Sequence, residues 1–314
     1  MSAPEEHPRT GFRLSLRGGP AVPLAGMVVA VVALTAAVTM GGEDSSSDTA
    51  QSPATMTASP VNDPADLPAR NSCLLKVGVT GQPLSVAGAR TLTQITAVGW
   101  QVKAPDEMVA RVLDLATAKA GTAVSVTDAL DMFTREDTAA PTAGALAQVR
   151  ALTEPGALTC VFDAPVAPSE SKGKTGLTPR AFAMRQGVID AFGKLTMSGF
   201  GGRSKTSNAA EAAGRALDVS VPTTISSRTS EAGAGWVLAH WLTARGADYK
   251  LDTIAYDDHV WSPTTGWRAT APGQPTATPA RPGRVYVAVT PGSSASKAGS
   301  SSKSAKKSGK KRGS

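Results

Sequence analysis

The sequence predicts an α+β protein in which helices flank an antiparallel sheet. Two strand patterns and two helix patterns carry this prediction. Between 217 and 221, aliphatic residues alternate with Asp218 and a serine, which is the period of a strand with one buried face. Valines alternate in the same way between 284 and 289. Apolar residues recur at helical spacing over 87–102 and 235–245.

An apolar run over 21–40 follows a leader, residues 1–20, that contains three arginines. About 20 apolar residues suffice to cross a bilayer as a helix. Arginines before the run and acidic residues after it predict a cytoplasmic N-terminus and an extracytoplasmic bulk. We expect an uncleaved single-pass anchor, because no small-x-small cleavage site follows the run. A cleaved signal peptide is the alternative, and it also leads to export.

Two segments read as linkers because they offer almost nothing to bury, namely 41–70 and 166–177. A Ser/Gly/Lys tail covers 291–314, and its cations equal the formal net charge of +7. The remainder is therefore close to neutral, which argues against nucleic acid as a partner. The tail reads either as a solvated end or as an adhesive segment for anionic wall polymers.

The first predicted domain, 71–165, is a small helical domain. Besides 87–102, helices are expected from Pro105 onward, after a cap at Thr127, and over 143–152. Its ends carry the two cysteines of the chain, Cys73 and Cys160. In an exported protein we expect them to form a disulfide worth about 4 kcal/mol, with two unpaired thiols as the alternative.

The second predicted domain, 178–290, combines helices with a sheet. Thr178-Pro179 is a helix start, and Gly193 is the matching stop. A hairpin is expected across Asp257-Asp258, followed by a turn over 262–266.

Three short sequences in this second domain carry a family resemblance over about 177–290. They are Gly214-Arg215-Ala216-Leu217-Asp218-Val219, Trp261-Ser262-Pro263 and Gly266-Trp267-Arg268. They resemble secreted actinobacterial domains related to D-alanyl-D-alanine zinc metallopeptidases. In that family a His, the Asp and a late His bind zinc, which activates a water against a peptide bond.

The resemblance implies positions for the zinc ligands, and most of them have changed. Asp218 stands where the zinc Asp is expected. Glu211 occupies the place of the first His, and Arg284 and Tyr286 occupy the places of two late histidines. The resemblance therefore implies a scaffold that has lost its metal-binding histidines.

A second resemblance covers 73–160. Leu115-Ala116-Thr117-Ala118, followed by 128–133, looks like a lysozyme-like transglycosylase domain. The catalytic Glu of that family falls at or near Gly121, which has no acid to protonate a leaving oxygen. An ordinary helical bundle is the alternative interpretation.

These resemblances predict a membrane-anchored protein that binds peptidoglycan or regulates an active wall hydrolase without catalysis of its own. No residue is assigned a catalytic role, and no cofactor is expected. The predicted binding groove consists of five residues: Glu211, Arg215, Asp218, Arg284 and Tyr286.

Two other functions remain open from the sequence. A divergent zinc peptidase would use Glu211, Asp218 and His259 as ligands, and a structural envelope protein would have no specific ligand. We further expect Asp218 to form a salt bridge with Arg284, and His240 to point to solvent or to the flank of its helix.

Overall fold

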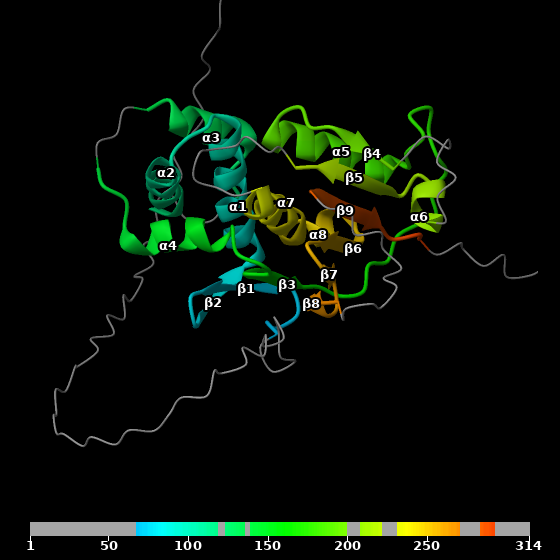
Figure 1. Ribbon diagram of the computed structural model, residues 1–314, viewed down its shortest axis with the longest axis horizontal. Helices are drawn as coiled ribbons and strands as arrows, with labels where there is room; N and C mark the ends of the chain where they lie inside the picture. The colour runs from blue at the N-terminus through cyan, green and yellow to red at the C-terminus, as the bar shows by residue number, and fades with distance from the viewer. Residues whose placement is uncertain are drawn as a thin grey trace, which may run out of the picture. The chain divides into compact units, whose positions relative to one another are not determined.

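The computed structural model describes most residues of the unit Thr57–Ser314 (Figure 1). A further unit, Met1–Met56, lies wholly outside the described residues. The described segments are 67–118, 123–135, 139–199, 208–221, 231–270 and 283–292.

The predicted anchor over 21–40 and the basic end of the tail therefore lie outside these segments. None of the described helices is both long enough and apolar enough to cross a bilayer.

The first region, which comprises the described residues between 71 and 165, contains a three-stranded antiparallel sheet in the order β2-β1-β3. Its strands are β1 (Ser72–Val77), β2 (Thr80–Ser85) and β3 (Leu158–Val161). The sequence analysis predicted a small helical domain over 71–165 and did not predict these strands. The strand β2 is exposed and lacks apolar alternation, while β3 has only four residues, all buried. Neither burial pattern is the alternation that predicts a strand from sequence. The pairing of β1 with β3 depends on tertiary contacts.

The helices of the first region confirm the predicted ones. They are α1 (Val86–Gln101), α2 (Asp106–Ala118), α3 (Val126–Phe133) and α4 (Ala143–Ala151). One cap differs from the prediction, because the side chain that caps α3 is Ser125 and not Thr127. The Ser125 hydroxyl accepts a hydrogen bond from the Asp128 amide at 3.1 Å.

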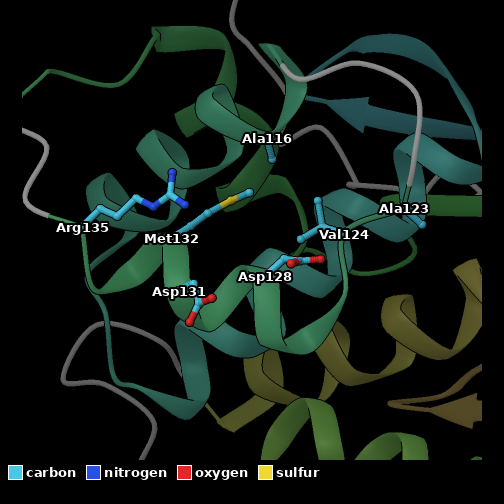
Figure 2. A pocket seen from close by; sticks show the side chains of 7 residues that line it. All are labelled: Ala116, Ala123, Val124, Asp128, Asp131, Met132 and Arg135. Atoms are coloured by element: carbon cyan, nitrogen blue, oxygen red, sulfur yellow. The ribbon is translucent and has the colours of Figure 1, made fainter. Parts of the chain in front are cut away.

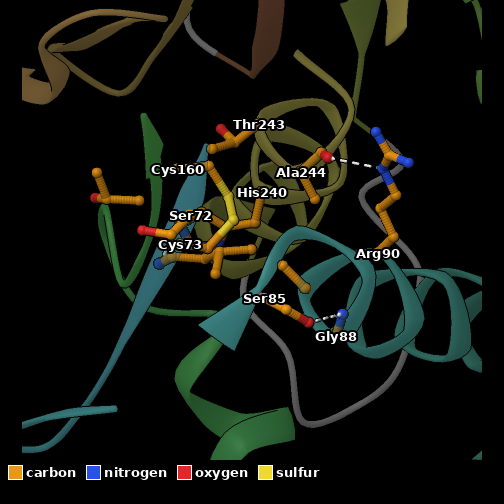
Figure 3. Close-up of a disulfide and its surroundings, with 12 residues drawn as sticks. Ser72, Cys73, Ser85, Gly88, Arg90, Cys160, His240, Thr243 and Ala244 are labelled. Carbon is orange, nitrogen blue, oxygen red and sulfur yellow. Dashed lines mark hydrogen bonds between the residues drawn. A yellow bond between two sulfur atoms is a disulfide. The ribbon is translucent and has the colours of Figure 1, made fainter. Parts of the chain in front are cut away.

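The predicted disulfide between Cys73 and Cys160 is confirmed (Figure 3). The two cysteines are directly paired across β1 and β3, and their Cα atoms are 4.0 Å apart. Both are buried, and residues of α7, His240 and Thr243 among them, surround the bond. The bond closes a sequence separation of 87 residues, which in the chain-entropy model stabilises the fold by about 4 kcal/mol.

The second region, which comprises the described residues between 178 and 290, contains a six-stranded antiparallel sheet in the order β4-β5-β9-β6-β7-β8. Its strands are β4 (Met197–Ser198), β5 (Ala216–Ser220), β6 (Leu251–Tyr256), β7 (His259–Ser262), β8 (Gly266–Ala269) and β9 (Arg284–Val289). The predicted hairpin is confirmed, since β6 and β7 pair across Asp257 and Asp258. Both turn residues have positive φ, 47° and 57°, as a tight hairpin turn requires.

Four helices accompany this sheet: α5 (Pro179–Phe192), α6 (Ala209–Ala212), α7 (Glu231–Ala244) and α8 (Gly246–Tyr249). Helix α5 begins after Thr178 and ends at Gly193, as predicted, and the φ of Gly193 is +77°. The architecture is thus α+β with antiparallel sheets and flanking helices.

The six-stranded sheet has two different faces. On the first, here called the α7 face, directly paired residues are apolar and fully buried, as Leu217, Val287, Ile254 and Trp261 are. Helix α7 packs there, because the Trp236 ring contacts Tyr256, His259 and Trp267.

The other face, here called the Asp218 face, carries the residues that alternate with these. Its central row is Asp218, Tyr286, Ala255 and Val260, each paired with the next across neighbouring strands.

The outer edge of β3 is bound by side chains from the second region. The carbonyls of Ala157 and Val161 accept hydrogen bonds from the amides of Lys76 and Asn71 on the β1 side. Because backbone groups alternate in direction along a strand, those of residues 158, 160 and 162 point away from β1. The Leu158 amide donates to His240 Nε2 at 3.3 Å. Two indole N–H groups, those of Trp267 and Trp261, donate to the carbonyls of Leu158 and Cys160 at 3.1 and 3.0 Å.

Finally, the Phe162 amide donates to the Pro263 carbonyl at 2.7 Å. We call this set of contacts the β3 seam. It satisfies strand-edge groups that would otherwise be buried without partners, which costs about 1–3 kcal/mol each. A boundary between domains at 166–177 stays a prediction, and the seam crosses it.

The prediction for His240 was wrong. This side chain is fully buried, and its Nδ1 lies 3.0 Å from the Leu152 carbonyl while Nε2 accepts from Leu158. This arrangement requires the neutral ring with the proton on Nδ1. Burial lowers the pKa of His240 to about 3, and the bond to Leu152 opposes this effect. Residues 233–244 of α7 are all buried, so the helix buries the flank that carries His240 as well as its predicted apolar stripe.

We predict that His240 makes the protein less stable in acid. Between pH 6.5 and 3 the unfolded chain binds a proton at this residue and the folded chain does not, so stability falls by about 1.4 kcal/mol per pH unit. Urea unfolding at pH 7.5 and 4.5 measures the difference. In His240→Gln this difference shrinks by roughly 3 kcal/mol, whereas the control His259→Gln retains it. Equal pH dependence of His240→Gln and the unmodified chain would contradict the assignment.

We also predict that Trp261→Phe lowers the free energy of unfolding by about 1–3 kcal/mol, because it leaves the buried Cys160 carbonyl without its donor. The matched control is Trp100→Phe, at a half-buried tryptophan of α1. Urea unfolding compares the two, and a smaller loss for Trp261→Phe than for the control would refute a role for the seam.

Candidate functional site

The residues at the implied zinc positions lie together on the Asp218 face. In the strand register, Asp218 is opposite Ser198 of β4 on one side and Tyr286 of β9 on the other. Asp218 is fully buried, and Tyr286 is 3 % exposed. Side chains alternate between the two faces along each strand. Because Leu217 and Val287 are buried on the α7 face, their neighbours Asp218 and Tyr286 lie on the Asp218 face.

Helix α6 joins this face through Asn208, a residue that the sequence analysis missed. The Asn208 Oδ1 atom caps the helix by accepting hydrogen bonds from the amides of Ala210 at 2.9 Å and Glu211 at 3.3 Å. Its Nδ2 atom donates to the Tyr286 hydroxyl at 3.0 Å. An asparagine directly before Ala-Ala-Glu-Ala is a cap signal in the sequence, but its bond to Tyr286 is not.

Glu211 is the unusual residue of the site. It is 2 % exposed, and among the described residues neither carboxylate oxygen has a hydrogen-bond partner. Gly199 lies against it, because a Cβ at that position would be 3.6 Å from the Glu211 Cδ atom and 3.3 Å from the Asp218 amide nitrogen. Burial of an ionised carboxylate without a partner costs several kcal/mol, so this group needs a cation, a donor or a proton.

The groups of the site interact electrostatically. Burial raises the pKa of Tyr286, the hydrogen bond from Asn208 lowers it, and the nearby carboxylates Glu211 and Asp218 raise it further. Arg215 has a smaller, lowering effect. The Tyr286 phenol therefore stays neutral at physiological pH and is a poor ligand for a metal ion.

The two arginines of the predicted groove occupy different places. Arg284 lies two residues before Tyr286 on β9, and its Nη1 atom donates to Ser198 Oγ at 2.8 Å. Its predicted salt bridge with Asp218 stays a prediction. Arg215 precedes β5 and donates from Nη1 to the Val289 carbonyl at 3.0 Å. The structure thus brings Glu211, Asp218, Arg284 and Tyr286 to one face, with Arg215 at its end.

The alternative zinc ligand His259 is not brought to this site. It lies on β7, two strands beyond β9, so it is roughly 14 Å from β5 at about 4.8 Å per strand. Its ring contacts Trp236 with centroids 5.2 Å apart, which places it on the α7 face. The other histidine of the described segments, His240, belongs to the β3 seam.

The residues present do not fit the catalytic zinc that the resemblance implies. Such a site needs three protein ligands and an open position. The Asp218 face offers two carboxylates, a neutral phenol and the Arg284 guanidinium, whose fixed charge opposes a cation. Within the described segments, no group of three or more His, Cys, Asp or Glu residues is placed to hold a metal ion. Gly121, the position of the missing acid in the other resemblance, lies outside these segments.

Fold and site together define an α+β protein whose antiparallel sheet carries a buried carboxylate site. The family model of the VldE C-terminal domain matches residues 173–279, so this part of the chain is similar to that domain. The match includes Glu211 and Asp218 and ends before β9. Neither a curated protein nor a solved structure matches the chain.

We predict that Asn208 and Tyr286 act together in holding α6 to the sheet. Asn208→Ala removes the cap and the bond to the hydroxyl, and lowers the free energy of unfolding by about 1–2 kcal/mol. A double-mutant cycle with Tyr286→Phe yields a coupling of at least about 0.5 kcal/mol. Asn71→Ala, at an exposed hydrogen bond to Asp163, serves as the control and shows no coupling to Tyr286→Phe. Strictly additive losses for Asn208 and Tyr286 would rule out the link.

Proposed function

We propose that this protein is an exported, membrane-anchored binding protein of the cell envelope that does not itself catalyse hydrolysis. In this proposal, residues 21–40 form the anchor and the two regions derive from peptidoglycan hydrolases that lost their catalytic groups. The resemblances to zinc metallopeptidase and lysozyme-like domains support it. The disulfide Cys73–Cys160 supports export, because such bonds persist in oxidising compartments outside the cytosol.

The observation that carries the proposal is the Glu211 carboxylate, buried beside Asp218 with no partner of its own among the described residues. A carboxylate in this state supports binding of a group that donates hydrogen bonds or carries positive charge. Both described histidines serve the α7 face and the β3 seam, so the side chains that would turn this site into a zinc peptidase are elsewhere.

The ligand we propose is a peptide of peptidoglycan. Peptides supply amide and ammonium donors, which carboxylates such as those of Glu211 and Asp218 accept, and the Arg284 guanidinium is a donor for a peptide carbonyl or carboxylate. We further propose that the basic tail over 291–314 adheres to anionic wall polymers, and that the protein holds or regulates an active wall hydrolase.

We predict saturable binding of soluble peptidoglycan fragments to the full-length chain in detergent, measured by isothermal titration calorimetry. Glu211→Gln weakens this binding at least tenfold, because it removes the charge of the acceptor. Glu154→Gln, at an exposed glutamate after α4, leaves the affinity unchanged. Circular dichroism confirms that both variants are folded. Absence of saturable binding, or equal affinity of the two variants, would reject the proposed function.

A further inference from the structure

Helix α3 lines a cavity of about 220 Å³ in the first region, far along the chain from the Asp218 face. Asp128, Asp131 and Met132 lie at positions i, i+3 and i+4 of α3 and so share one face of the helix, and Arg135 follows two residues after the helix ends. The cavity is shown in Figure 2, and its lining residues are Ala116, Ala123, Val124, Asp128, Asp131, Met132 and Arg135.

The cavity has two side chains of opposite charge at its surface. In the described part of the chain, no hydrogen bond or ion pair engages the Asp131 carboxylate or the Arg135 guanidinium, and both residues are exposed. Asp131 is in the last turn of α3, and Arg135 lies two residues beyond the end of the helix. Here both charges remain available. Asp128 adds a second carboxylate one turn earlier, although its Oδ2 atom accepts from the Ser125 hydroxyl at 2.7 Å.

The remaining lining is apolar. Met132 and Ala116 are each 8 % exposed, and Val124 is half-buried. Figure 2 shows the Arg135 side chain extending toward Met132. Pockets for drug-sized molecules measure roughly 300–1,000 Å³, so this one suits a smaller ligand.

We propose that this cavity binds a small zwitterion of the α-amino acid class. The ammonium group of the ligand binds the Asp131 carboxylate, with the free oxygen of Asp128 next to it. The ligand carboxylate pairs with the planar guanidinium of Arg135, whose two parallel N–H groups match its oxygens. A short apolar side chain rests on Met132 and Val124.

A saccharide is an alternative small ligand, because its hydroxyl groups form hydrogen bonds with acidic and basic side chains. The cavity has no aromatic side chain in its lining on which a sugar ring packs. The opposite charges of Asp131 and Arg135 in one lining favour a ligand that itself carries both charges at a short separation. This inference is independent of the wall-peptide proposal, because it concerns other residues and another ligand.

The test titrates the full-length chain with alanine and valine, each in both enantiomers, and follows binding by calorimetry. We expect saturable binding of at least one of them. Acetylation of its amino group or amidation of its carboxylate weakens binding at least tenfold. Asp131→Asn and Arg135→Gln have the same effect, whereas Asp252→Asn and Arg268→Gln, at exposed positions of the six-stranded sheet, do not.

Because Asp131 and Arg135 are exposed, both variants are expected to fold, which circular dichroism verifies. Three outcomes would overturn the inference. These are no binding of any of the four amino acids, unchanged binding of the acetylated or amidated forms, and preferential binding of N-acetylglucosamine or chitobiose in the same titration.

Discussion

The β3 seam couples the two sheets and fixes the position of α7 between them. A strand with a buried outer edge needs hydrogen-bond partners, and β3 finds them in His240, Trp261, Trp267 and Pro263 rather than in another strand. The disulfide ties β3 to β1 on its other side. Helix α7 is thereby held against both sheets. This arrangement requires the neutral imidazole of His240 and buries Trp261 and Trp267 in the core.

This constraint also decides where a ligand site is available. With α7 on one face of the six-stranded sheet, alternation along β5 and β9 sends the polar residues to the other face. Asp218 and Tyr286 meet there, and Asn208 holds α6 so that Glu211 faces them. The two histidines of the described segments serve the scaffold. Among the described residues, the site therefore has carboxylate acceptors but no histidine.

Local patterns predicted the parts of this fold that depend on local interactions. Alternation predicted β5 and β9, turn residues predicted the hairpin at Asp257, and Pro and Gly marked the ends of α5. The strands β1 and β3 were missed because their pairing joins residues about 90 positions apart in a pattern too short to recognise. His240 was misplaced for a related reason, since its partners Leu152 and Leu158 lie more than 80 residues away. The Asn208–Tyr286 bond spans 78 residues.

We propose that the carboxylates of the Asp218 face bind a ligand without zinc-dependent catalysis. The most direct measurement is hydrolysis of peptidoglycan stem peptides by the full-length chain after dialysis against zinc, with the bound metal quantified by mass spectrometry. We expect no turnover and no stoichiometric zinc in the unmodified chain, and therefore no change in either on Asp218→Ala. Stoichiometric zinc together with turnover that Asp218→Ala abolishes would contradict it.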